Sequence, residues 1–206
     1  MADRYALVVD ATNNNIKEIP AADRLVADNL LLSGTTPTLT IGDAGAEDTK
    51  IVFDGNAQDF YIGLDDSADD LLIGLGSAVG TTPAISIDEN LVTKATAYAD
   101  TYLAPTSSSN ATTINCRGGN YFKHTLTENT TFTFSNPPAS GTGFSFVLHL
   151  IQDSSARTVT WPNSVDWASA TAPTISTGNG DDDFFVFATS DGGTIWYGFT
   201  AGQAMA

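Results

Sequence analysis

The two histidines, His124 and His149, are the side chains of this 206-residue chain best suited to exchange protons near neutral pH. His149 falls in the alternating segment 144–151, in which Phe146 and Leu148 occupy one face of an expected strand and His149 the other. A catalytic base needs an orienting partner and a nucleophile within reach, and no recognisable motif supplies them. We therefore expect structural or surface roles for both histidines and no catalytic residue.

Acidic residues gather in two places, at 65–70 and at 181–183. Their carboxylate oxygens suit a hard cation, but neither group has the ligand spacing of an EF-hand loop. Paired carboxylates also suit glycoside hydrolysis, yet the sequence gives no sign of the long groove and larger scaffold such an enzyme needs. We expect solvated turns here, and therefore neither an enzyme nor a site for a metal or another cofactor.

Aromatic residues concentrate in the second half, where Trp161, Trp167, Trp196, Tyr197 and Phe199 could form a platform for sugar rings. Aromatic side chains in a β-domain more often fill the core. Trp161 and Trp196 lie inside strand candidates, so we expect both to be buried. Trp167 lies in a loop-like stretch and is the candidate for contact with a glycan.

The chain is acidic, because 24 Asp and Glu against eight Lys and Arg give a formal charge of −16. Residues 1–105 hold 17 of the acidic and five of the basic residues. Such a surface repels phosphate backbones and anionic lipid, so we expect no binding to nucleic acid or membrane. Cys116, the single cysteine, excludes an intrachain disulfide and is expected to be a buried apolar side chain. No apolar stretch is long enough to span a bilayer, and the first ten residues lack the apolar run of a signal peptide.

The elements that must position these residues divide the chain into three parts, 1–33, 34–104 and 105–206. In the first part, Tyr5 to Val9 is typical of a strand, and the segment 21–32 suits either a helical turn or a second strand. Neither element could fold alone. We therefore expect an attachment segment that docks on something larger, with Tyr5, Leu7 and Val9 as its contact residues.

The second part contains an internal repeat, since Gly34-Thr-Thr-Pro-Thr-Leu-Thr-Ile41 recurs 46 residues later as Gly80-Thr-Thr-Pro-Ala-Ile-Ser-Ile87. Both copies predict a turn that leads into a strand, and the segments 50–53, 60–62 and 71–75 are further strand candidates. Strands this short rarely form a stable isolated sheet. Three chains wound together into a β-shaft would bury the apolar positions that one chain leaves exposed.

Residues 90–104 are the helix candidate, with Asp88 or Asn90 as N-cap and Pro105 beyond the end. This helix would line a three-helix junction or simply link the two domains. The third part, 105–206, begins with a polar linker and continues with six strand candidates separated by Gly, Pro, Asn and Asp turns. These are 121–126, 130–134, 144–151, 157–161, 184–188 and 194–199. Their number and spacing predict an antiparallel β-sandwich or jelly roll, so the fold class is mainly β.

Three stretches of the sequence resemble structural proteins of marine and cyanobacterial tailed phages. The opening segments 1–10 and 15–20 resemble the start of many such proteins, and segments 59–66 and 70–87 are similar to repeats in tail-fibre shafts. Segments 125–138, 160–162, 172–173 and 191–199 resemble a terminal domain found on such fibres.

The resemblance implies a homotrimeric, mostly β, non-enzymatic protein of the virion that docks on capsid, portal or tail proteins. The chain has two partial repeats and no self-cleaving chaperone domain, which favours a short fibre, a spike or a capsid-decorating knob over a long fibre. The alternative is a receptor-binding module whose C-terminal domain recognises a host surface glycan.

Overall fold

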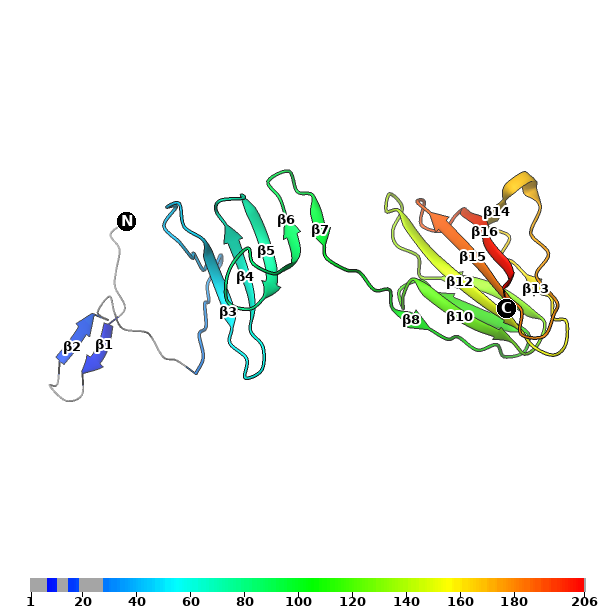
Figure 1. The fold of residues 1–206 in the computed structure, drawn as a ribbon, viewed down its shortest axis with the longest axis horizontal. Coiled ribbons are helices and arrows are strands. Elements are labelled where there is room, and N and C mark those ends of the chain that lie inside the picture. Colours follow the sequence, from blue (N-terminus) through cyan, green and yellow to red (C-terminus); the bar gives the residue numbers. More distant parts are fainter. Residues whose placement is uncertain (1–6, 11–14, 19–27, 206) are drawn as a thin grey trace. The chain divides into compact units, whose positions relative to one another are not determined.

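The structure, a computed structural model, describes residues 7–10, 15–18 and 28–205, and it is mainly β (Figure 1). Within these residues the only helical element is a short 3₁₀ turn at Ala168–Ala170, and no helix has the length and apolarity needed to cross a bilayer. The chain forms two compact units, Met1–Thr96 and Ala97–Ala206. The division therefore falls before the position 104 expected from the sequence.

The first described element is a hairpin of β1 (Leu7–Asp10) and β2 (Asn15–Glu18), which pair antiparallel with Leu7 opposite Glu18 and Val9 opposite Ile16. β1 overlaps the strand expected at 5–9. Tyr5, the first of the expected attachment residues, lies outside the described residues, as does most of the segment 21–32.

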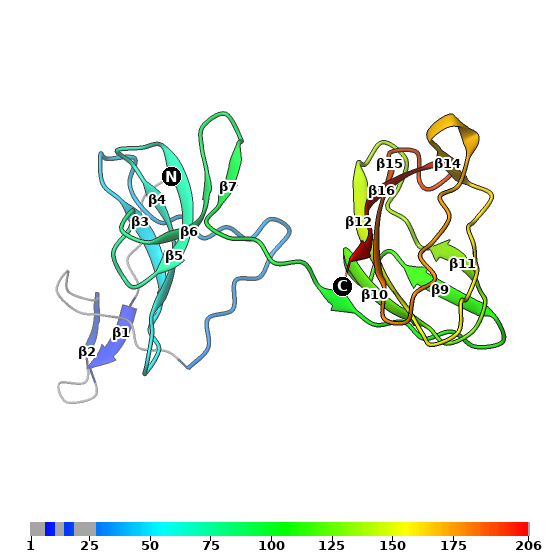
Figure 2. The same ribbon diagram turned by 45° about the vertical axis from the view of Figure 1, so that its right-hand side comes forward.

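The first unit is built around a five-stranded antiparallel sheet in which the strands follow one another in chain order (Figure 2). They are β3 (Thr49–Phe53), β4 (Phe60–Asp65), β5 (Asp70–Leu75), β6 (Pro83–Ile87) and β7 (Thr93–Ala95). The turn expected at 65–70 is confirmed, since residues 66–69 connect β4 to β5, and Asp65 and Asp70 pair with each other at the ends of these strands.

The two copies of the repeat differ in structure. The second copy forms β6, which pairs with β5 on one side and with β7 on the other. The first copy contains bends but no strand, so the expectation of a strand at 37–41 is wrong for this chain on its own. The difference lies in the partners, because a β-strand exists only where a neighbour completes its hydrogen bonds.

The helix expected at 90–104 is also wrong, because this segment forms β7, a stretch without regular secondary structure and β8 (Tyr102–Leu103). Asp88 does accept backbone N–H groups, from Asn90 and Val92 at 2.9 Å each, but it caps a turn rather than a helix. Leu91 in that turn has a φ of +64°, which breaks a right-handed helix. The turn returns the chain along β6, and the β-branched residues that follow favour extended backbone.

The second unit packs a six-stranded sheet of order β14-β16-β15-β12-β10-β8 against a three-stranded sheet of order β13-β11-β9. The remaining strands are β9 (Ala111–Asn115), β10 (Tyr121–Leu126), β11 (Thr130–Ser135), β12 (Phe144–Gln152), β13 (Val159–Thr160), β14 (Val165–Trp167), β15 (Asp182–Thr189) and β16 (Trp196–Met205). All six strands expected from the sequence overlap a strand of this unit, and β8, β9 and β14 were missed. The arrangement is consistent with a β-sandwich.

The six-stranded sheet is mixed and the three-stranded sheet is parallel, which corrects the expected antiparallel arrangement. From β8 to β14 successive strands alternate between the two sheets, so that neighbours within one sheet run in the same direction. Only β12, β15 and β16 pair antiparallel. The sequence does not distinguish the two arrangements, because the same turn residues occur where consecutive strands pair antiparallel and where the chain crosses to the other sheet.

The core of the second unit is aromatic and lies between its two sheets. Phe134 from the three-stranded sheet makes edge contacts with Phe146, Phe187 and Trp196 from the six-stranded sheet, at ring-centroid distances of 4.9–5.3 Å. Such pairs add to the hydrophobic gain from burying the rings. This unit therefore has a complete core of its own.

Candidate functional site

One face of the five-stranded sheet of the first unit is apolar, and the described part of the chain leaves it uncovered. We call its nine exposed large side chains the apolar ladder; they are Ile51, Phe53, Phe60, Ile62, Leu64, Leu71, Ile73, Leu75 and Ile85, each 36–56% exposed. Alternation along the strands puts these residues on the same face.

The pairing of the strands arranges the apolar ladder in rows. The central row runs Ile51–Ile62–Ile73–Ile85 and ends at Ala95 on β7. A second row runs Phe53–Phe60–Leu75, and a third runs Thr49–Leu64–Leu71–Ile87–Thr93. No charged residue occupies any of these positions, although the chain carries 24 acidic residues. The face is therefore free of the charge that would otherwise oppose contact with another copy.

The opposite face of the same sheet is covered by the chain itself. Tyr61 is fully buried and Leu72 is 3% exposed, and the hydroxyl of Tyr61 accepts a hydrogen bond from the Gly80 N–H at 3.2 Å. Gly74 makes room for the ring, because a methyl group there would lie 2.5 Å from Tyr61. The connection between β5 and β6 thus closes a small core on this face and leaves the apolar ladder open on the other.

The apolar ladder is large enough for a stable interface. Its side chains expose apolar area on the order of 800 Å², similar to what each partner contributes to a standard protein–protein interface. A typical monomer exposes contiguous apolar patches of only roughly 300–600 Å². The chain segments that the structure describes leave this surface to solvent.

The second unit also has an uncovered face, on the side of its six-stranded sheet that points away from the core. A row of side chains crosses five strands there, running Tyr102–Tyr121–Val147–Val186–Phe199 in register. Tyr102 and Phe199, at the two ends of this row, are each 56% exposed. Tyr197, two residues before Phe199 on β16, is exposed as well.

His149 lies in the middle of that face within a polar cluster. Its Nε2 is 2.9 Å from Asp182 Oδ1 and its Nδ1 is 3.3 Å from the Tyr121 hydroxyl, while Phe184 stacks on the ring at 4.2 Å. The alternation expected along this strand is confirmed, since Phe146 and Leu148 point into the core. His149 is only 7% exposed, and among the described residues no serine, threonine or cysteine hydroxyl or thiol is hydrogen-bonded to it. The cluster fits a structural role better than a base poised to activate a nucleophile.

His124 is buried on the inner face of the same sheet, at 1% exposure. Its Nδ1 lies 2.7 Å from the carbonyl oxygen of Pro105, and its ring meets Phe132 edge-on. Nε2 has no hydrogen-bond partner among the described residues. Burial lowers the pKa of His124 below its ordinary value, against the opposing effect of the Pro105 carbonyl. His124 is therefore a residue of the core.

Trp167 is not the exposed platform expected from the sequence. It is 8% exposed and packs on Trp161, Phe185 and Phe187 inside the core. The ring of Trp167 fits in the core because its partner on the neighbouring strand β16 is Gly198. A methyl group on Gly198 would lie 2.7 Å from the six-membered ring of Trp167.

A shallow groove nevertheless lies at this place, lined by Asp166, Trp167, Ala168, Tyr197, Gly198 and Phe199. Tyr197 and Phe199 are its exposed aromatic residues. Trp161 and Trp196 were expected to be buried inside strands. This is confirmed for Trp196, which is 1% exposed within β16, whereas Trp161 is only partly buried and lies just after β13.

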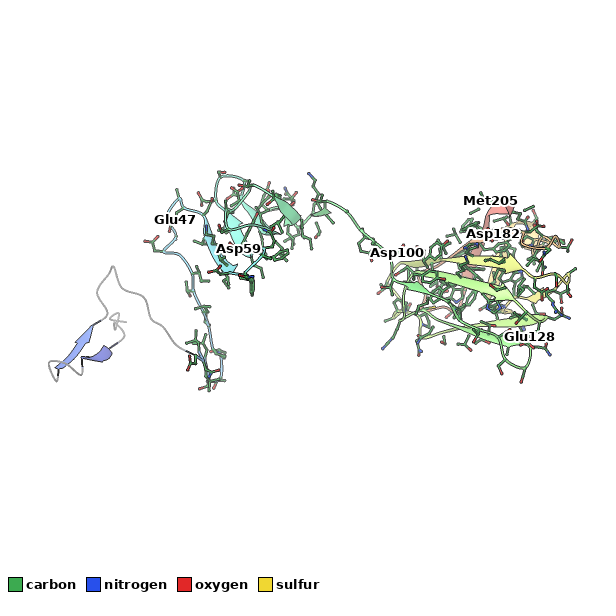
Figure 3. The ribbon with its side chains drawn as sticks, turned by 60° about the horizontal axis from the view of Figure 1, so that its bottom comes forward. Glu47, Asp59, Asp100, Glu128, Asp182 and Met205 are labelled. Carbon is green, nitrogen blue, oxygen red and sulfur yellow. The ribbon has the colours of Figure 1, made fainter. Side chains whose placement is uncertain are left out.

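The acidic residues do not gather into a metal site in the described part of the chain, where no group of three or more His, Cys, Asp or Glu side chains is placed to hold an ion. At 181–183 the three carboxylates diverge: Asp181 binds the Gly178 N–H, Asp182 binds His149 and Asp183 is buried. Asp182 lies opposite Met205 near the end of the chain (Figure 3). Cys116 is buried as expected, at 4% exposure.

Comparison with protein-family models, with curated proteins and with solved structures finds no match for this chain. The candidate site therefore rests on the geometry of the two uncovered faces and on the sequence itself.

Proposed function

We propose that this protein is a structural protein on the surface of a tailed bacteriophage virion, where it acts as a homotrimeric short fibre, spike or capsid-decorating knob. The apolar ladder carries the proposal. A surface of this size and composition costs free energy in water, and burial against equivalent faces of other copies removes that cost. The covered face of the first unit and the core of the second unit are each formed within one chain. The apolar ladder is therefore the surface of the first unit that assembly would bury.

The sequence resemblance to phage structural proteins is the basis for proposing three chains per assembly and a location on the virion. Three sheets placed around a common axis can each turn one face inward, so the apolar ladder suits the inside of a three-chain shaft. The segment 1–33 would attach the trimer to a capsid, portal or tail protein, with Tyr5, Leu7 and Val9 as contact residues. The work of the protein in this proposal is assembly and attachment, without catalysis, cofactor or metal.

Light scattering on the purified full chain tests the proposal. We expect a mass three times that of one chain, and the same mass after removal of residues 1–33. A chain that remains monomeric at tens of micromolar would overturn the assembly, and a stable dimer would overturn the trimer. Antibodies raised against the protein should label particles of the phage that encodes it, and unlabelled particles would overturn the virion location.

The aromatic groove of the second unit favours a second candidate function, recognition of a host surface glycan. Tyr197 and Phe199 project from the same face of β16, and Asp166 pairs with Tyr197 across the edge of the sheet. Aromatic faces suit the apolar faces of sugar rings, and a carboxylate can accept hydrogen bonds from sugar hydroxyls.

Calorimetric titration with purified host surface polysaccharide tests this second function. Tyr197→Ala should weaken binding by at least roughly tenfold, the equivalent of about 1.4 kcal/mol. Tyr102→Ala, which removes an equally large exposed ring from the opposite edge of the same sheet, is the matched control and should leave binding unchanged. Absence of binding by the unmodified protein would remove the candidate.

A further inference from the structure

The first copy of the repeat has the sequence of a strand but no strand partner. Leu39 and Ile41 correspond to Ile85 and Ile87 of the second copy, both of which lie in rows of the apolar face. In the structure Leu39 is 57% and Ile41 is 44% exposed. Among the described residues, the segment 34–41 takes part in no hydrogen bond between backbone groups. In a single chain, this segment therefore has the sequence of a strand but leaves its backbone groups unpaired and its apolar side chains exposed.

The sheet of the first unit has two edges, and they are not equally protected. β7 is three residues long and carries Lys94, and a short strand with a lysine is a common way to block further pairing. β3 is five residues long, pairs with β4 alone among the described strands, and contributes Ile51 and Phe53 to the apolar ladder. The outer edge of β3 is therefore the open place at which a further strand would extend the rows.

The first copy does not fill this edge in its own chain, although it lies near it. Ile41 borders the same groove as Thr49, Ile51 and Ile62. The bend that connects the two segments has positive φ angles at Gly42 and Ala44, and the Asp43 carboxylate holds it by accepting the Gly45 N–H at 3.1 Å. This bend brings the segment beside β3 without the ladder of hydrogen bonds. When the segment 37–41 comes from another copy, the bend at 42–45 does not link it to the β3 strand that it approaches, so the bend does not restrict how the two can pair.

We propose that residues 37–41 of one copy add as a strand to the outer edge of β3 in a neighbouring copy. Leu39 and Ile41 then extend the rows of the apolar ladder from one chain to the next. The backbone groups of the segment find partners, and the exposed edge of β3 is covered. This inference rests on the self-assembly proposed above and adds to it that each sheet is completed in trans.

Crosslinking between two differently tagged single variants tests the pairing. Leu39→Cys and Ile51→Cys chains are co-expressed, oligomers that carry both tags are purified, and a short bis-maleimide is added. Cys116 does not compete, because it is buried and burial raises the pKa of its thiol to about 11. We expect a covalent species of two chains, seen under denaturing conditions.

The matched control pairs Leu39→Cys with Ala95→Cys, which lies in the same row as Ile51 but at the β7 edge. This pair should give no two-chain species. Doubly tagged oligomers in which the Leu39–Ile51 pair stays uncrosslinked would overturn the pairing while leaving the assembly intact. A third variant that carries both Leu39→Cys and Ile51→Cys tests pairing within one chain. If this variant crosslinks within itself while the two single variants give no two-chain species, the edge is filled in cis and the proposal is overturned. Failure to recover any doubly tagged oligomer would count against the assembly itself.

Amide hydrogen exchange on the unmodified protein provides a second measurement. The proposal expects the amides of residues 38–41 to exchange at least roughly tenfold more slowly in the oligomer than in a monomeric variant. Equal exchange in the two forms would contradict strand pairing by this segment.

Discussion

Ile62 and Ile73 lie directly opposite each other on β4 and β5, at the centre of the apolar ladder, and each is more than a third exposed. The substitution Ile62→Asp places a carboxylate in the middle of this surface. Burial of an unpaired charge in an apolar interface is strongly unfavourable, whereas the same charge in a monomer stays in water. We expect the variant to remain folded and to lose self-association, with a one-chain mass by light scattering.

Leu91→Asp is the matched control for this prediction. Leu91 is 83% exposed, lies outside the apolar ladder and has a positive φ that aspartate tolerates well. The same change of residue type should therefore leave the mass of the assembly unaltered. If Ile62→Asp and wild type have the same mass, the apolar ladder is not the assembly surface.

Gly74 and Tyr61 provide a prediction about the covered face. Gly74→Ala puts a methyl group where the Tyr61 ring lies, so the ring must move away and the small core opens. Overpacking of this kind costs about 1–3 kcal/mol. Amide exchange of β4 and β5 should become faster to a matching degree. Gly143→Ala, which meets nothing within 4 Å, should leave that exchange unchanged.

The sequence identified features that depend on local pattern. The alternation of 121–126 and 144–151 gave β10 and β12 nearly to the residue, because a period of two is visible within one strand. The same reasoning gave β6 from the second repeat copy. It also indicated that a single chain would leave apolar positions of the first unit exposed, since each of its strands is short and apolar on one side.

Other features depend on residues distant in the sequence, and these could not be predicted from local pattern. Trp167 is buried because Gly198, on a different strand, gives its ring space. Asp88 has the residue type of a helix cap, but it closes a turn because β6 is available as a partner for β7. Strand direction in the second unit depends on which sheet each strand joins.

Asp183 is a buried carboxylate of β15 that is hydrogen-bonded to two other segments of the second unit, one at Ser176 and one at Ala204. It is 3% exposed and accepts hydrogen bonds from the Ser176 N–H at 2.7 Å, the Ser176 hydroxyl at 2.6 Å and the Ala204 N–H at 3.0 Å. Asp183→Asn replaces one accepting oxygen with a donor that faces other donors. We expect a loss of roughly 2–3 kcal/mol in the free energy of unfolding.

Urea denaturation followed by tryptophan fluorescence measures this loss, because all three tryptophans lie in the second unit. Asp181→Asn is the control, since this neighbouring carboxylate is more exposed and accepts the Gly178 N–H near the surface. A control variant as unstable as Asp183→Asn would mean that the buried contacts of Asp183 are not the cause.

His124 should make the stability of the second unit depend on pH. Its pKa in the folded state lies below the ordinary value of 6.5 because the ring is buried, so the unfolded chain takes up a proton at a pH where the folded chain does not. The free energy of unfolding should therefore decrease as the pH falls below about 6.5. His124→Asn keeps a donor for the Pro105 carbonyl but cannot titrate in this range. Measured as the urea midpoint by tryptophan fluorescence from pH 7.5 to 5, the variant should start lower and decrease less steeply than wild type. An equally steep decrease in both proteins would assign the pH dependence to other groups.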